Sequence, residues 1–306
     1  MYGHTNWRGV RLHETPLQDG ESAAKLLAYY GIPKNHPLVT EFVSAMRDES
    51  VLRQEFSLNS SAEAQFSTRY SGLRQGAGLY TITYALQAML GHGDDGYANH
   101  FQEISLDAFA AMLNITNIEE ITEDKLKKRG NYNYHYVTED KFLPCCYHLA
   151  MLAYSQSWRT PANIKLLASA INHMNNDLIN NTDGILVKCG KNYLGPLGCL
   201  IGHFSVRHPF SVKYNNGVMQ RRLLTEMAMC GLGGSAEILR QSAENVKEAL
   251  SGDGVLRLKY PVKRDKYNAV GGYDEVFLEP DYKRKTALDC DLTFWAVQFL
   301  SLAGDG

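Results

Sequence analysis

The chain has 306 residues, which is enough for one large domain with a substantial buried core. Hydrophobic residues make up 44% and charged residues 21% of the sequence, and 31 Lys and Arg against 33 Asp and Glu give a net charge of -2. This balance gives no electrostatic reason to expect a nucleic acid or an anionic membrane as a partner.

Signals for export or membrane insertion are not found in the sequence. No apolar stretch reaches the roughly 20 residues that a membrane span needs, so no transmembrane segment is expected. The N-terminus MYGHTNWRGVRLHE has no apolar signal core. Six cysteines are too sparse for a secreted disulfide scaffold, so a cytoplasmic location is expected.

Amphipathic helices recur along the chain, and each is followed by a short turn-rich break. Apolar residues at i, i+3 or i+4 and i+7 place one stripe on a helix in five segments. These stripes begin at Ala23, Leu79, Leu143, Met219 and Leu292. The breaks that follow them read GIPKNHP, GHGDDG, SQSWRTP, GLGGS and GDG.

A second helix is predicted after four of these breaks, with apolar stripes from Leu38, Phe101, Ile164 and Leu239. The breaks are too short for a crossover between parallel strands, so each pair is predicted to form an antiparallel helical hairpin. A fifth helix is expected from about Thr286. A further, uncertain pair of helices is expected between residues 192 and 210.

Asp-Gly pairs recur after the second helices. Asp183–Gly184 and Asp253–Gly254 are turn signals that lead into short apolar runs. A repeated unit of helix, turn, helix and Asp-Gly turn predicts hairpins arranged around an axis. Residues 122–142 and 259–285 interrupt this pattern and are predicted to be long loops, serving as lids, binding loops or plain surface insertions.

Two of the predicted units, Leu26 to Leu52 and Leu223 to Leu256, resemble the helical-hairpin repeat of the terpenoid-cyclase and protein-prenyltransferase superfamily. The resemblance implies an all-α fold. It implies a single α/α toroid over residues 1–306, built from five or six helical hairpins with two long rim loops. The first helix of each hairpin would then line a central aromatic cavity.

The stretch LDCDLTFW, from Leu288 to Trp295, carries the closest resemblance. It looks like the prenyltransferase segment in which an aspartate and a cysteine bind zinc, with Asp291 in place of the cysteine. It also resembles the Asp-x-Asp-Asp-Thr motif of type II terpene cyclases, matched by Asp289, Asp291 and Thr293. This resemblance implies that Asp291 is the general acid and Asp289 its partner. Helix capping by either aspartate is the alternative.

The expected activity is protonation or cyclisation of an isoprenoid or another apolar substrate. Two carboxylates that share a proton could supply the acid, and aromatic faces could stabilise a carbocation. Side chains on the predicted first helices are the candidate substrate contacts: Tyr80, Tyr84, Tyr147, Tyr154, Phe294, Trp295 and His148.

Two alternatives remain open. Cys199 and His203 are four residues apart and would share one helix face, and Cys146 opens another predicted helix. These three residues could hold zinc in an enzyme similar to a prenyltransferase or a lanthionine cyclase. No cofactor other than zinc is indicated. The remaining alternative is a non-catalytic toroid that binds a lipid or a protein partner.

Overall fold

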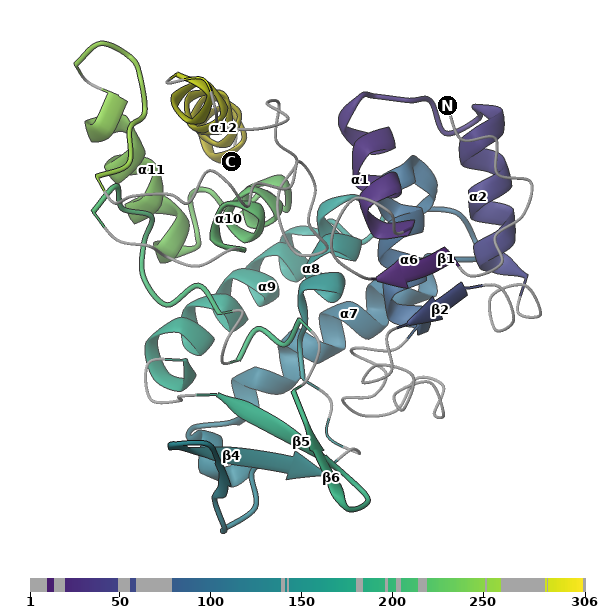
Figure 1. Ribbon diagram of the computed structural model, residues 1–306, viewed down its shortest axis with the longest axis vertical. Helices are drawn as coiled ribbons and strands as arrows, with labels where there is room; N and C mark the ends of the chain where they lie inside the picture. Colours follow the sequence, from purple (N-terminus) through teal and green to yellow (C-terminus); the bar gives the residue numbers. More distant parts are fainter. Residues whose placement is uncertain are drawn as a thin grey trace.

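The computed structural model describes residues 10–13, 20–48, 56–58, 79–138, 141, 143–179, 184–195, 198–201, 205–213, 219–250, 252–259, 284 and 286–304. Helices dominate these residues (Figure 1). The α-helices are α1 (Gly20–Tyr29), α2 (Pro37–Arg47), α6 (Leu79–Gln87), α7 (His100–Ala110), α8 (Cys146–Ala153), α9 (Pro161–His173), α10 (Gln220–Met229), α11 (Glu237–Leu250) and α12 (Ala287–Gly304). Shorter helical segments are η1 (Ala88–His92), η2 (Ala111–Asn114), η3 (Ile118–Glu120) and η4 (Met174–Leu178).

Local sequence signals explain where the helices start and end. Pro37 and Pro161 occupy first helical positions, where a missing N–H costs nothing. The hydroxyl of Thr160 caps α9 by accepting a hydrogen bond from the Asn163 N–H at 3.2 Å. Gly31 and Gly231 end α1 and α10 with positive φ angles of 64° and 77°. The helices predicted from the repeated apolar stripes are therefore present in the predicted order.

The first helices of successive pairs contact one another. α6 packs against α1 and α8, and α10 packs against α8 and α12. The ring of Tyr29 at the end of α1 meets the edge of Phe294 on α12 at 6.2 Å. Of the second helices, α7 packs against α8 and α9, and α11 packs against α12. Helices from the beginning, middle and end of the chain therefore share one core.

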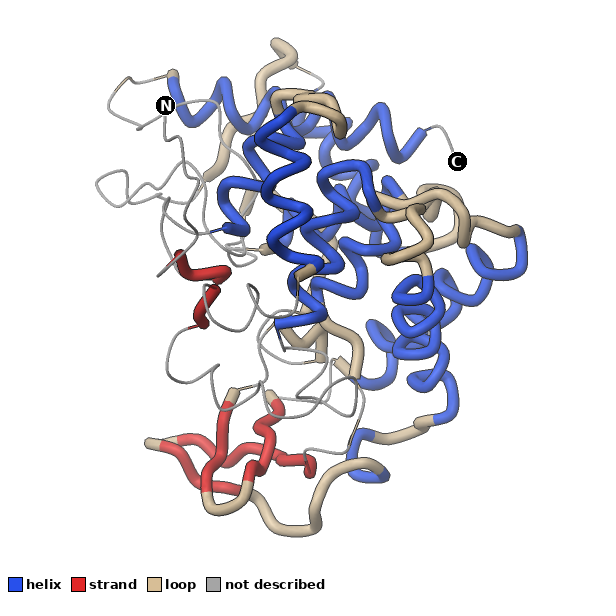
Figure 2. Tube along the Cα trace, turned by 90° about the vertical axis from the view of Figure 1, so that its right-hand side faces the viewer, coloured by secondary structure: helices blue, strands red, loops and turns tan. Residues whose placement is uncertain are grey.

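The prediction of an all-α fold is wrong, because the chain also forms a four-stranded sheet (Figure 2). Its strands are β3 (Lys127–Arg129), β4 (Tyr132–Thr138), β5 (Ile185–Cys189) and β6 (Asn192–Leu194). Residues 122–142, predicted to be a loop at the rim, therefore contain β3 and β4. The predicted loop at 259–285 lies outside the described residues except for Lys259 and Arg284.

The sheet is mixed and lies at the lower end of the molecule in Figure 1. Its order is β3-β4-β5-β6, with an antiparallel pair on each side of the parallel pair β4 and β5. Val137, Ile185 and Val187 are buried on one face. The strands β1 (Val10–His13) and β2 (Phe56–Leu58) form a separate parallel pair. Within the described residues, no helix combines the length and apolarity needed to cross a membrane.

The helices expected between residues 192 and 210 are absent from the described part of this segment. It begins with β6, and Cys199 then forms an isolated antiparallel bridge with Cys145. Backbone hydrogen bonds from Cys146 N–H to Gly198 O at 2.8 Å and from Leu200 N–H to Pro144 O at 3.0 Å hold this bridge. The segment therefore fixes the start of α8.

Candidate functional site

Five ionisable side chains meet in the protein interior between α1, α8 and α10. We call this group the buried ion cluster: Glu21, Lys25, Tyr147, Arg222 and Glu226. Each of the five is at most 7% exposed. Glu21, Tyr147 and Arg222 belong to the first turns of their helices. The cluster therefore joins helix starts that are far apart in the sequence.

Glu21 lies at the centre of the cluster. One carboxylate oxygen, Oε1, contacts Lys25 Nζ at 3.1 Å and Arg222 Nη1 at 3.2 Å. The other oxygen accepts a hydrogen bond from the Tyr147 hydroxyl at 2.9 Å. Donors from three helices therefore surround one carboxylate, and such donors favour its anionic form.

Glu226 is the second carboxylate of the cluster. Its Oε1 accepts a hydrogen bond from Arg222 Nε at 2.8 Å. Its Oε2 is buried and has no hydrogen-bond partner among the described residues. Burial raises the pKa of Glu226 and the neighbouring Arg222 lowers it, with a net pKa above the ordinary value. Burial, and then Arg222, lower the pKa of Lys25.

Helical spacing explains how the sequence builds this cluster. Glu21 and Lys25 are four residues apart on α1, and Arg222 and Glu226 are four apart on α10. Each pair therefore lies on one helix face. Burying charged groups is costly even when they are paired, so a cluster of this kind is a candidate functional site.

The two aspartates predicted to act as an acid pair, Asp289 and Asp291, lie in different environments on α12. Asp291 is 7% exposed and lies on the buried stripe with Leu288 and Trp295. The side chain of Asp289 is 29% exposed and contacts Arg257 Nε at 3.5 Å. Residues two apart on a helix point to different sides, so these two carboxylates do not face each other. Neither residue is the N-cap, because Asp289 already belongs to the first turn of α12.

Several predicted substrate-contacting aromatic residues are packed against other rings. Tyr84 is buried and stacks on Phe101 at 4.8 Å. Trp295 stacks on Phe299 at 5.2 Å, and its Nε1 donates a hydrogen bond to Thr225 at 3.0 Å. An apolar hollow in the core, lined in part by Phe109, has a volume of about 10 Å³, which is too small for a substrate.

The other predicted contacts occupy varied positions. Phe294 is 45% exposed at the contact with α1. Tyr154 is half-buried at the end of α8, and burial followed by the charge of Glu226 raises its pKa. Tyr147 belongs to the buried ion cluster. Tyr80 lies in α6, but its side chain is outside the described part of the structure.

His148 is fully buried, and its ring lies 5.7 Å from the ring of Phe101 on α7. Its Nδ1 accepts a hydrogen bond from the Cys145 N–H at 3.1 Å, which ties down the first turn of α8. Burial lowers the pKa of His148 to about 3. The imidazole is therefore neutral at neutral pH.

The predicted zinc ligands are not assembled into a site by the described residues. Cys199 lies in an extended bridge, whereas the sequence predicts that it lies in a helix. His203 lies outside the described residues. Cys146 is buried, and burial raises its pKa. Within the described residues no three His, Cys, Asp or Glu side chains form a group that could hold a metal ion.

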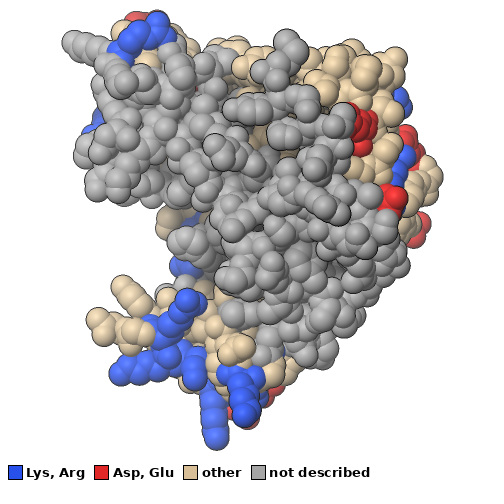
Figure 3. Space-filling model, turned by 45° about the vertical axis from the view of Figure 1, so that its right-hand side comes forward, with Lys and Arg blue, Asp and Glu red and all other residues tan. Residues whose placement is uncertain are grey.

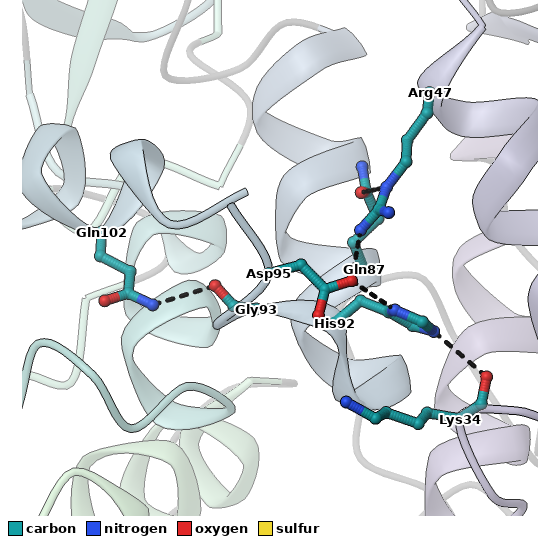
Figure 4. A network of polar contacts seen from close by, with 7 residues as sticks. All are labelled: Lys34, Arg47, Gln87, His92, Gly93, Asp95 and Gln102. Atoms are coloured by element: carbon teal, nitrogen blue, oxygen red, sulfur yellow. Dashed lines mark hydrogen bonds and ion pairs between the residues drawn. The ribbon is translucent and has the colours of Figure 1, made fainter. Parts of the chain in front are cut away.

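The GHGDDG turn forms a second polar network (Figure 4). Asp95 accepts a hydrogen bond from Arg47 Nη2 at 2.9 Å and contacts His92 Nδ1 at 2.8 Å. His92 Nε2 contacts the carbonyl of Lys34 at 3.2 Å, and Arg47 Nε donates to Gln87 at 2.8 Å. The network therefore ties the turn before α7 to α2, and we interpret it as structural.

Comparison with protein-family models, with curated proteins and with solved structures found no match for this chain. The buried ion cluster was not predicted from the sequence, because its charged residues were not part of the apolar stripes. A usable signal was present. Glu21 and Lys25, like Arg222 and Glu226, are opposite charges four residues apart on helices whose other residues are mostly small or apolar.

Proposed function

We propose that the protein is an enzyme that uses the buried ion cluster for general acid–base catalysis. The main support for this proposal is the difference between the surroundings of two buried carboxyl groups. Two buried carboxylates, Glu21 and Glu226, contact the same Arg222 guanidinium but have different surroundings. Glu21 has three donors around it, whereas Oε2 of Glu226 has no hydrogen-bond partner among the described residues. Carboxyl groups whose surroundings differ in this way can serve as acid and base in one reaction.

In this proposal Glu226 is the proton donor, because burial raises its pKa toward the range that suits a general acid. Glu21 is the base. Arg222 holds both carboxylates, and the Tyr147 hydroxyl orients Glu21. The N-terminal ends of α1, α8 and α10 carry partial positive charge and add stabilisation for negative charge near Glu21.

The substrate class that we propose is a glycoside. Cleavage of a glycosidic bond uses one carboxylic acid to protonate the leaving oxygen and a second carboxylate as base or nucleophile. Charged partners such as Lys25 and Arg222 suit a polar, hydroxyl-rich substrate better than a hydrocarbon. Hydrolysis would break the bond between the anomeric carbon and the leaving oxygen, which takes the proton of Glu226. Water would supply the hydroxyl of the sugar product, and its other proton would pass to Glu21.

A second candidate is the cyclisation of an isoprenoid with Asp291 as the acid. The observation that favours it is the burial of Asp291, one helical turn before Trp295, on the face of α12 that packs against α10. Trp295 is within 4.9 Å of the Phe210 ring, so aromatic faces are near this carboxyl group.

One experiment compares the two candidates. The purified protein, Glu226→Gln and Asp291→Asn are incubated with a panel of nitrophenyl glycosides and with polyprenyl diphosphates, and products are identified by absorbance and mass spectrometry. We expect glycoside cleavage that falls at least about 100-fold in Glu226→Gln, as for loss of a general acid, and is retained in Asp291→Asn. Circular dichroism checks that both variants are folded.

Other outcomes contradict the main proposal. Cyclised polyprenyl products that disappear in Asp291→Asn would favour the second candidate. Glycoside cleavage that is equal in the wild type and in folded Glu226→Gln would exclude Glu226 as the acid. A wild-type protein without turnover on either set would favour the non-catalytic alternative.

A further inference from the structure

The pairing of residues in the four-stranded sheet places tyrosines and cationic side chains on one face. Side chains alternate between faces along a strand, and directly paired residues share a face. The pairs Lys127–Tyr134, Arg129–Tyr132 and Lys188–Tyr193 therefore lie on the same face as Tyr136. We call this surface the basic tyrosine face: Lys127, Arg129, Tyr132, Tyr134, Tyr136, Lys188 and Tyr193.

The cations of this face are accessible. Lys127, Arg129 and Lys188 are exposed, and Lys128 and Lys191 are exposed close by in the same strands and turns. Figure 3 shows Lys and Arg side chains gathered over the sheet at the lower end of the molecule. Acidic residues also lie near one end of the face: the negative charges of Glu123 and Asp124 act on Tyr136, and the Glu123 N–H donates to Tyr136 O.

The tyrosine side chains of this face differ in exposure. Tyr132 is 67% exposed, Tyr134 and Tyr193 are half-buried, and Tyr136 is buried. The Tyr136 and Tyr193 rings meet edge to face at 5.0 Å, and the Lys127 ammonium lies 4.3 Å from the Tyr193 ring centre. Lys127 and Tyr193 belong to the two edge strands, so the sheet curls around this face and makes it concave.

We propose that the basic tyrosine face binds single-stranded nucleic acid. Phosphates would pair with the exposed cations, and bases would stack on Tyr132 and Tyr134. Aromatic rings interleaved with cations fit a ligand that carries both flat rings and regularly spaced negative charges. The opposite face of the middle strands carries the core residues Val137, Ile185 and Val187. On this face Tyr136 and its partner Leu186 are also buried, so the accessible part is the region of Tyr132, Tyr134 and the exposed cations.

The net charge of -2 does not contradict this proposal, because it averages over the whole chain. Binding depends on the local surface, where three exposed cations lie on one concave face. The buried ion cluster belongs to other elements, α1, α8 and α10. Nucleic-acid binding at the basic tyrosine face therefore does not depend on the proposed enzyme activity.

The test is fluorescence anisotropy of the full chain with a labelled single-stranded oligothymidylate at several salt concentrations. Binding should weaken linearly on a plot of log affinity against log salt. The double variant Lys127→Ala, Lys188→Ala should reduce the magnitude of this slope by about 1.4, since each phosphate contact contributes about 0.7. The double variant Tyr132→Ala, Tyr134→Ala should weaken binding at least about tenfold.

Matched controls change the same residue types elsewhere. Lys165→Ala with Lys247→Ala removes two exposed lysines from α9 and α11, and Tyr30→Ala removes a 71% exposed tyrosine just after α1. These controls should leave the affinity and the salt slope unchanged. If the double tyrosine variant does not fold, Tyr132→Ala alone provides the test, because this exposed side chain is not part of the core.

Three results would overturn the proposal. The first is an absence of binding even at about 50 mM salt, where phosphate contacts are strong. The second is binding that the tyrosine variants do not change. The third is equally tight binding of duplex DNA or a sulfated polysaccharide, which would show a site for polyanions in general.

Discussion

Asp94 and Asp95 are neighbours in the sequence, but they bind different parts of the structure. Asp95 contacts Arg47 at the end of α2. Asp94 accepts hydrogen bonds from the backbone N–H groups of Gln156 and Ser157, from the Ser157 hydroxyl and from Gln102. This single turn therefore connects three helical hairpins. The acidic residues of the GHGDDG sequence are explained by these contacts without a metal or a phosphate.

We predict that Asp94→Ala lowers the free energy of unfolding by about 1–2 kcal/mol at pH 7, because several donors lose a charged acceptor. Burial raises the pKa of Asp94, but the bonds from Ser157, Gln156 and Gln102 outweigh it and hold the pKa below its usual value. The folded pKa is thus below the unfolded value of about 3.9. The charged form therefore stabilises the fold above that value, and this contribution is lost as pH falls through the folded pKa.

Urea unfolding of the wild type and Asp94→Ala between pH 7 and pH 3 tests this prediction. The difference between the two proteins should shrink below about pH 4. Asp107→Ala, a change at an exposed aspartate on α7, is the control and should stay within about 0.5 kcal/mol of the wild type. A difference for Asp94→Ala that is independent of pH would show that its charge does not matter.

Residue types alone did not identify the candidate site. The paired aspartates of LDCDLTFW resemble known motifs, but helical geometry places Asp289 and Asp291 on different sides of α12. Glu21 and Arg222 match no motif and are 201 positions apart, and only the folded structure brings them together. Sequence spacing indicates which residues share a helix face, but not which helices meet.

At the scale of elements, the buried face of α1 differs from the predicted one. The predicted apolar stripe includes Ala23 and Tyr30, both of which are exposed. The buried face instead carries Glu21, Ala24 and Lys25. The helix therefore turns charged side chains inward, where α8 and α10 supply partners for them.

The turn between α10 and α11 packs tightly against the end of α12. A Cβ atom on Gly233 would lie 2.1 Å from the carbonyl oxygen of Ala303. We predict that Gly233→Ala lowers the free energy of unfolding by about 1–3 kcal/mol, because backbone must move to relieve the clash. Thermal and urea unfolding provide the measurement.

Gly252→Ala is the matched control for this element. A Cβ atom there meets nothing within 4 Å, and the residue is exposed. It should unfold within about 0.5 kcal/mol of the wild type. Equal stability of the two variants would contradict the close packing of this turn on α12.

The helices were predictable from the sequence, whereas the sheet was not. Apolar spacing, prolines at helix starts and glycines at helix ends are local signals, and all of them act within one helix. In β4 the sequence YNYHYVT does alternate tyrosine with other residues, which is a strand signal. The neighbouring strand β3, Lys127–Arg129, contains no apolar residue, so the sequence alone indicates no strand partner for β4.

At the scale of the whole molecule, each candidate site is built from segments that are far apart in the sequence. Residues near positions 21, 147 and 222 build the buried ion cluster, and two segments from 127–138 and 185–194 build the sheet with the basic tyrosine face. The overall amino-acid composition and net charge indicate neither the buried ion cluster nor the basic tyrosine face. A chain with a net charge of -2 carries an exposed cationic face, and its core contains two carboxyl groups that contact one guanidinium.

The central claim is that Glu226 keeps its proton at a pH where an ordinary glutamate has lost it. An infrared titration of the wild type, from which the spectrum of Glu226→Gln is subtracted, measures this directly through the carbonyl band of the protonated carboxyl group. We predict that this band persists above about pH 4.3, the pH at which an unperturbed glutamate is half ionised, because burial raises the pKa of Glu226. A band that disappears at about pH 4 together with the surface carboxyl groups would contradict the proposed acid–base centre.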